Sequence, residues 1–229
     1  MRTHRTGTSA TSTISRRPEL HVTRQTGVMS DPETPHTSPA YQAFSSDGHV
    51  AKWAPWEQPT DDSGEAVHEA LTIVWENEAW TASGVVGREQ VHYILRISPT
   101  WHVRQFLLFR DLEDPDLWLG TDGHGRWGEM NGAHRPELDG CVDLDLPCTP
   151  FTNTIPIRRL PLQVGDTAEI KVAYIDVETL DVQPDRQRYT RLDTHRWRFE
   201  QLSTGWNQEF EVDRFGLVRD YPTLFRRID

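Results

Sequence analysis

The stretch QVHYILRI, residues 90–97, carries the clearest folding pattern in the chain. Apolar side chains occupy every second position: Val91, Tyr93, Leu95 and Ile97. The positions between them are polar, except for Ile94. Successive side chains of a β-strand point to opposite faces of the sheet, so this alternation predicts a strand with one buried face. HRWRFE at residues 195–200 and QEFEVD at residues 208–213 repeat the pattern.

Shorter strand-like stretches extend this pattern along the chain. They are residues 70–75, 80–86, 103–109, 117–119, 126–130, 142–146, 168–175 and 186–192. Turn-forming pairs such as Ser98-Pro99 separate them. Residues 149–162 contain three prolines, so they are predicted to form mostly a folded loop with at most a short helix. The prediction is a mostly β fold: a single antiparallel β-roll or barrel-like domain with at most short helices.

The charge balance argues against one class of partner. The 229 residues contain 24 Lys and Arg against 35 Asp and Glu, which gives a formal net charge of −11. A nucleic-acid-binding surface needs basic side chains to neutralise phosphates, so no nucleic-acid partner is expected. No apolar run approaches the ~18 residues of a membrane-spanning helix, so no transmembrane segment is expected. Without a recognisable secretory signal, the expected location is cytoplasmic.

The first 45 residues differ in composition from the rest of the chain. Arg, Thr, Ser and Pro dominate there, and large apolar residues are scarce. Such a segment cannot offset its ordering entropy by burying apolar surface. Residues 1–45 are therefore predicted to be a disordered tail, and residues 46–229 a single β domain. Whether translation starts at Met1 or at Met29 stays open.

Two short motifs suggest a cofactor or a metal, and each has a simpler interpretation. GHGRWG, residues 123–128, matches a dinucleotide-binding pattern that requires a following helix; strand-like residues follow instead, which favours a glycine-rich turn. Cys141, Asp143, Asp145 and Cys148 could act as metal ligands, but their spacing fits no standard zinc pattern. In a strand, the first three would share one solvated face. No metal and no cofactor is expected, and both cysteines are expected to be thiols.

Arginine and tryptophan supply the strongest compositional signals. Arginines gather in the C-terminal half: Arg158, Arg159, Arg186, Arg188, Arg191, Arg196 and Arg198. Their guanidinium groups could bind a carboxylate or phosphate ligand, but pairing with Glu and Asp on neighbouring strands is favoured. The chain also has nine Trp. Most are expected in the core, and two or three are expected to line a pocket.

Several runs of sequence carry a resemblance to a known family. They are DGHGRW (122–127), LDGCVDLD (138–145), TPFTNTIPIRRL (149–160), VAY (172–174), QRY (187–189), DRFGLV (213–218) and DYPTLF (220–225). On these motifs, residues 53–227 resemble the putative glycolipid-binding family of bacterial proteins. The resemblance implies a spiral β-roll with a concave interior and a glycolipid or other amphiphile as the ligand. It implies no catalytic residues.

Residues in and near these motifs are the candidate ligand contacts: Trp127, Asn153, Arg158, Arg159, Gln187 and Tyr189. Trp127 could stack on a sugar ring or form the floor of an acyl tunnel. Asn153 could fix its own loop or donate to a ligand, and the first is favoured. Arg158 and Arg159 point in different directions, so one is expected to pair with Asp143 or Asp145. Gln187 and Tyr189 would share a strand face.

Three functions follow, in order of preference. The first is non-enzymatic binding of a glycolipid or another amphiphile in an apolar cavity, with the candidate polar groups at its mouth. The second is an enzyme acting on a sugar- or lipid-like substrate through an Asp/Arg site such as Asp143 and Arg158, recognisable by ionisable groups that converge in a wet cleft. The third is a homo-oligomeric interaction module, for example a homodimer.

Overall fold

The computed structural model describes residues 22–23, 41–57, 69–87, 90–110 and 113–229. The predicted disordered tail, residues 1–45, lies outside this part of the chain except for residues 22–23 and 41–45. The latter pack on the domain: Phe44 is buried and stacks on Phe215, and Trp197 Nε1 donates a hydrogen bond to Tyr41 Oη at 2.9 Å. The packed structure therefore includes residues that precede the predicted boundary at residue 46.

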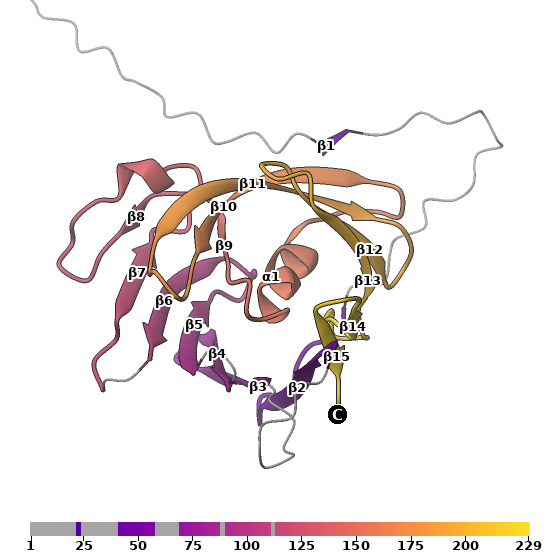
Figure 1. The fold of residues 1–229 in the computed structure, drawn as a ribbon, viewed down its shortest axis with the longest axis horizontal. Coiled ribbons are helices and arrows are strands. Elements are labelled where there is room, and N and C mark those ends of the chain that lie inside the picture. Colours follow the sequence, from indigo (N-terminus) through magenta and orange to yellow (C-terminus); the bar gives the residue numbers. More distant parts are fainter. Residues whose placement is uncertain (1–21, 24–40, 58–68, 88–89, 111–112) are drawn as a thin grey trace, which may run out of the picture.

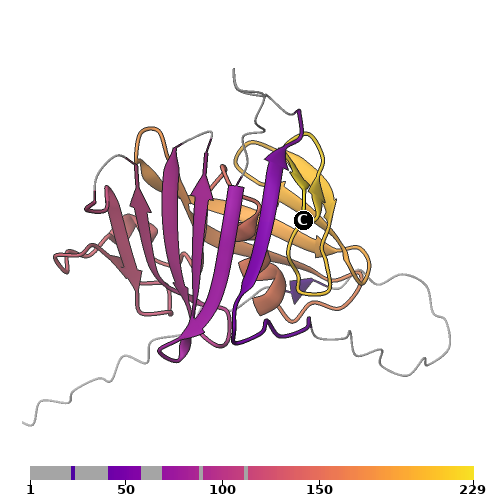
Figure 2. The same cartoon turned by 90° about the horizontal axis from the view of Figure 1, so that it is seen from below.

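The larger of two β-sheets has nine strands, all antiparallel to their neighbours, in the order β14-β15-β2-β3-β4-β5-β6-β7-β8. Figure 2 shows most of them side by side. The strands are β2 (His49–Pro55), β3 (Glu69–Glu76), β4 (Ala79–Val86), β5 (Val91–Ile97), β6 (Val103–Phe109), β7 (Leu117–Thr121), β8 (Trp127–Gly128), β14 (Asp220–Tyr221) and β15 (Phe225–Arg227).

The smaller sheet has the order β1-β10-β11-β12-β13, and β9 joins it by pairing with β10. The strands are β1 (Val22–Thr23), β9 (Asp143–Asp145), β10 (Thr167–Ile175), β11 (Val182–Arg191), β12 (Arg196–Gln201) and β13 (Asn207–Glu211). Among the described residues, β9–β10 is the one parallel pair, and all other pairs are antiparallel. The two sheets curve around a shared interior without closing into a barrel (Figure 1).

The predicted mostly β fold is confirmed, and so are the three alternating stretches of the sequence. Residues 90–97 form β5, residues 195–200 form most of β12, and residues 208–213 overlap β13. β2, β14 and β15 were not predicted. In β2 the buried positions do not alternate strictly, because Trp53 and Ala54 are both buried. β14 and β15 have two and three residues, which is too short for a periodic pattern.

The prediction of a mostly folded loop at residues 149–162 is wrong in its centre. Phe151–Arg159 forms the α-helix α1, preceded in the chain by a short 3-10 helix at Pro136–Leu138. Pro156 lies inside α1 and removes one backbone donor. The helix forms nonetheless because its first seven residues are all buried, so tertiary packing outweighs the unfavourable propensity.

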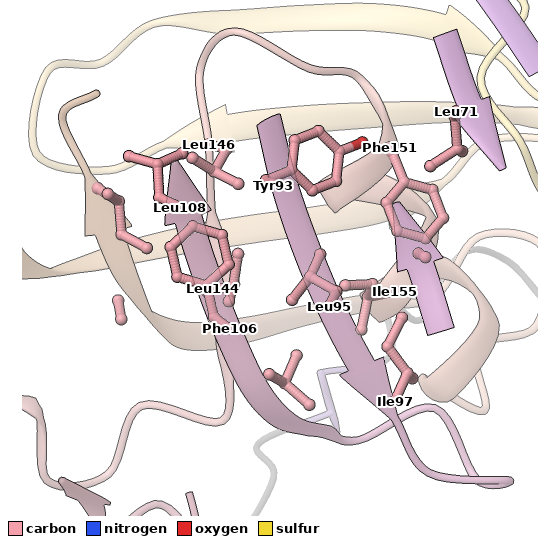
Figure 3. Packing of buried hydrophobic residues seen from close by; sticks show 14 of the residues in the cluster. Leu71, Tyr93, Leu95, Ile97, Phe106, Leu108, Leu144, Leu146, Phe151 and Ile155 are labelled. Atoms are coloured by element: carbon pink, nitrogen blue, oxygen red, sulfur yellow. The ribbon is translucent and has the colours of Figure 1, made fainter. Parts of the chain in front are cut away.

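Helix α1 occupies the space that the two sheets enclose (Figure 1). Phe151 and Ile155 belong to a core cluster with Tyr93 and Leu95 of the larger sheet, whereas Ile157 packs in a second cluster with residues of the smaller sheet. Figure 3 shows the first of these contacts. In the described part of the chain, α1 thus occupies the interior in which an apolar cavity was expected, and its buried side chains pack against the larger sheet there.

We expect Gly84→Ala to lower the free energy of unfolding by about 1–3 kcal/mol, because an added methyl group would overpack the core. Gly84 lies opposite Tyr93 in the β4–β5 pair, and a Cβ atom at residue 84 would overlap the Tyr93 ring. That ring cannot move aside easily, since it is fully buried and its hydroxyl donates to Glu69 Oε1 at 2.6 Å. Chemical denaturation would measure the loss. Val85→Ala is the control, since Val85 is the exposed neighbour on the same strand; equal losses in both variants would refute the packing argument.

Candidate functional site

A network of polar side chains links β9, β11 and α1 inside the domain. Gln187 Nε2 donates to Asp145 Oδ2 at 2.7 Å, and Thr152 Oγ1 donates to Asp145 Oδ1 at 3.0 Å. Next to them, the Tyr189 hydroxyl donates to Asn153 Oδ1 at 3.0 Å. Gln187 and Tyr189 are 1% and 2% exposed, so these bonds satisfy polar groups that have left water. The network holds the Asp145 carboxylate and the Asn153 amide in place.

A pocket of about 220 Å³ lies over this network, where the inner face of the smaller sheet meets the β14–β15 edge of the larger one. Its lining comes from both sheets, from α1 and from the turns between them: Asp145, Leu146, Pro147, Thr149, Asn153, Tyr174, Phe199, Gln201, Trp206, Tyr221, Leu224 and Phe225. Segments far apart in the sequence therefore form one site.

Three aromatic rings of the pocket stand at steep angles to one another. Phe199 and Trp206 have ring centroids 5.6 Å apart at an interplanar angle of 60°. Trp206 and Tyr221 lie 5.9 Å apart at 85°. Trp206 and Leu224 are each 37% exposed, so they stand at the mouth of the pocket, whereas Phe199 and Tyr221 are buried. The result is a small recess with aromatic walls and an apolar rim.

The charge state of Asp145 is set by its surroundings. Burial raises the pKa of its carboxyl group, and the neighbouring Asp185 carboxylate acts in the same direction. The hydrogen bonds from Gln187 and Thr152 oppose this rise in pKa because they stabilise the ionised form. Asp145 takes part in none of the ion pairs among the described residues.

The second carboxylate of β9 is in a different environment. Asp143 forms an ion pair with Arg159, and their side chains are only 1% and 6% exposed. This confirms that one of the two adjacent arginines pairs with Asp143 or Asp145. It also corrects the prediction of a solvated strand face, since Cys141 and Asp143 are both completely buried. Helix α1, which was expected to be mostly loop, covers that face.

Arg158 lies elsewhere. Its guanidinium carbon is 4.3 Å from the Trp101 ring centroid and 4.8 Å from that of Phe44. It donates to the carbonyl oxygen of Gln42 at 3.1 Å and to that of Phe215. Burial lowers its pKa to about 10. The structure therefore does not place Arg158 beside Asp143, with which it was named as an example of an Asp/Arg site; the partner of Asp143 is Arg159.

Trp127 is also remote from the pocket. It is 1% exposed and belongs to the core, where its Nε1 donates to the carbonyl oxygen of Cys141 at 2.9 Å. Of the six candidate residues, Asn153 lines this pocket, and Gln187 and Tyr189 are hydrogen-bonded to its lining residues Asp145 and Asn153 without lining it themselves. Arg159 pairs with the neighbouring carboxylate on β9, and Arg158 and Trp127 lie elsewhere. Whether any of the six contacts a ligand stays a prediction.

Sequence reasoning missed most of the pocket lining. Asp145 was considered only as a metal ligand or as the partner of an arginine, and Trp206 only as one of nine Trp. Tyr221, Leu224 and Phe225 lie within the family motif at residues 220–225 but carried no signal of their own. The motif could have drawn attention to them, because it combines two aromatic residues with a turn.

A second, shallower groove of about 420 Å³ lies at the β7–β8 end of the larger sheet. Trp118, Trp127, Arg104 and Arg126 contribute to its lining. The GHGRWG motif forms the turn beside it: Gly123 and Gly125 adopt positive φ angles of 76° and 91° between β7 and β8. The interpretation of this motif as a glycine-rich turn is confirmed.

The remaining arginines of the smaller sheet mostly pair across strands, as expected. Arg188 contacts Glu169 and Glu200, and Arg198 contacts Glu209. Among the residues that the structure describes, no three His, Cys, Asp or Glu side chains gather as metal ligands would. Burial raises the pKa of the Cys141 thiol to about 11. No helix in the described part of the chain is long and apolar enough to cross a membrane.

Fold and site together define a class of protein: an open, mostly antiparallel β-roll filled by a helix, with a small aromatic pocket where its sheets meet. The chain belongs to the family described as "Putative glycolipid-binding", whose model matches residues 53–227. It is also similar to the crystal structure of a DUF1089 family protein from Pseudomonas aeruginosa, with 31% sequence identity and a TM-score of 0.59 over 88% of this chain and 100% of that one. No curated protein matches the chain.

Proposed function

We propose that the protein binds the head of a glycolipid or a similar amphiphile in the pocket between its sheets, without a chemical reaction. The observation that carries the proposal is the combination of aromatic walls with a fixed carboxylate in one recess. The apolar faces of a sugar ring pack on aromatic side chains, while its hydroxyl groups need acceptors such as Asp145. The family description points to the same class of ligand.

The size of the pocket supports binding of the head rather than the whole lipid. Its volume of about 220 Å³ is below the roughly 300–1,000 Å³ typical of pockets that enclose drug-sized ligands. An acyl chain would therefore leave through the mouth, where Trp206 and Leu224 offer apolar surface. Contact there would contribute about 25 cal/mol for each Å² of apolar surface removed from water.

The alternative of an enzyme with an Asp/Arg site has less support. The Asp/Arg pair that forms, Asp143 and Arg159, is buried by packing and does not line the pocket. Arg158 instead contacts the rings of Phe44 and Trp101 and the carbonyl oxygens of Gln42 and Phe215. The alternative of a homo-oligomeric interaction module stays a prediction.

Octyl glucoside, used below its micelle-forming concentration, is a suitable probe of this function. We expect Trp206→Ala to weaken its binding at least about tenfold, because the ring forms both a wall and part of the rim. Trp75→Ala is the matched control, since Trp75 is 38% exposed against 37% for Trp206 and lies outside the pocket. Isothermal titration calorimetry would measure both affinities. A wild-type protein that binds neither octyl glucoside nor any lipid in a broad panel would refute the proposal.

A further inference from the structure

The charge of the pocket restricts its ligand. Of the twelve residues that line it, Asp145 is the only Asp, Glu, Lys, Arg or His. The buried guanidinium of Arg159, which ends α1, is held by Asp143. A phosphate, sulfate or carboxylate head would meet a carboxylate there without a cation to offset the repulsion. The lining therefore disfavours an anionic head.

Asp145 also keeps unused acceptor capacity. Its hydrogen bonds come from three neutral donors: the Gln187 amide, the Thr152 hydroxyl and the backbone N–H of Leu146. An ionised carboxylate offers roughly four acceptor positions, so about one remains for a ligand. Asp143, two residues earlier on the same strand, is matched by a guanidinium instead. The two carboxylates of β9 thus differ in kind: one is neutralised within the protein, and the other faces a cavity.

The aromatic walls fit the same kind of ligand. Phe199, Trp206 and Tyr221 present rings at 60° and 85° to one another within 6 Å between neighbouring centroids. Faces of aromatic rings attract cations through their quadrupoles, so aromatic side chains that line a pocket favour an alkylated ammonium group. A carboxylate beside these rings adds a direct counter-charge.

We propose that the head bound in this pocket carries an ammonium group, either on an amino sugar or as a quaternary ammonium, held by the aromatic walls and Asp145. This inference rests on the proposed function, because it concerns the head of the same amphiphile. Burying the charge of Asp145 without a cationic partner costs free energy, and a bound cation offsets that cost. An uncharged head of the same shape leaves the cost in place, so the pocket discriminates by charge.

Two pairs of small probes test the proposal on the wild-type protein. The first is choline and its uncharged isostere, in which a tert-butyl group replaces the trimethylammonium group. The second is glucosamine and glucose. We expect the charged member of at least one pair to bind at least about tenfold more tightly, measured by calorimetry or by ligand-observed NMR. The pair that discriminates more strongly identifies the source of the ammonium group.

Asp145→Asn then tests the assignment to this pocket. We expect the variant to lose most of the preference for the charged probe, while its binding of the uncharged probe changes little. Asp220→Asn is the matched control. Asp220 is an exposed neighbour of Tyr221 and does not line the pocket, so this substitution removes the same charge outside the pocket. If Asp145→Asn does not fold, Trp206→Ala replaces it in this test, because the Trp206 ring lines the same pocket.

Each outcome decides the matter. Equal affinities within both wild-type pairs, or tighter binding of glucuronate than of glucosamine, would overturn the inference. So would a charge preference that survives in a folded Asp145→Asn variant. The proposed function has a separate readout: if octyl glucoside binds but charge makes no difference, the inference fails while amphiphile binding stands. If the charged heads bind and no amphiphile does, the proposed function fails, and the inference about the head of its ligand fails with it.

Discussion

Arg159→Ala is expected to lower the free energy of unfolding by about 3–5 kcal/mol, because it would leave Asp143 as a buried carboxylate without its counter-charge. Both side chains of this pair are nearly inaccessible to water, at 6% and 1% exposure. The pair also joins the last turn of α1 to β9, so its loss removes a link between the helix and the smaller sheet. Urea denaturation followed by tryptophan fluorescence would measure the change.

The matched control is Arg198→Ala. Arg198 also pairs with a carboxylate, that of Glu209, but both partners are 43% exposed, and exposed pairs contribute at most about 1 kcal/mol. A double variant, Asp143→Leu with Arg159→Leu, should recover much of the stability because it removes both buried charges together. If Arg159→Ala were no more destabilising than Arg198→Ala, the burial of the pair would not have the energetic role assigned to it.

Phe151→Ala is expected to cost about 3–5 kcal/mol, the range for removing a large aromatic side chain from a packed core. Phe151 is completely buried at the start of α1, and it faces residues of the larger sheet such as Leu71 (Figure 3). It therefore anchors the helix that fills the roll. Since α1 also carries Asn153 and Thr152, we expect ligand affinity to fall together with stability.

Phe109→Ala separates this effect from the general loss of a phenyl ring. Phe109 is only half-buried on β6, where it stacks on His92 outside the core clusters. Its replacement should cost clearly less and leave ligand affinity unchanged. Thermal and chemical unfolding of both variants, combined with titration of octyl glucoside, would test this. Similar losses of stability in the two variants would contradict the role given to α1 as the centre of the core.

The pattern of the sequence was most informative where one strand face meets the core and the other meets water. Residues 90–97 alternate except at Ile94, and β5 alternates buried and half-buried positions in the structure. The prediction failed at β9 and α1 for a related reason. LDGCVDLD looks like a strand with one polar, solvated face, but α1 packs over that face and buries Asp143. Alternation identifies two faces, but it does not say what covers each of them.

The candidate site, too, was predictable from the sequence only where its geometry is local. Gln187 and Tyr189 were expected to share a face because they are two residues apart on a strand, and this geometry is local. Neither side chain lines the pocket itself, and the residues that do come from segments as distant as Asp145 and Phe225. No local pattern relates these positions, because their proximity depends on how the β14–β15 hairpin returns to the edge of β2 and faces the smaller sheet.

The sequence by itself determined the class of fold, most of the strands and the family, because period-two burial and the family motifs are properties of short segments. Only the tertiary structure decided that α1 fills the roll, that Arg159 rather than Arg158 neutralises Asp143, and that Asp145 faces an aromatic recess. These features depend on long-range packing, in which a side chain's partner is chosen by the path of the whole chain. The charge of one small pocket, and with it the kind of head that we propose it binds, is a consequence of that path.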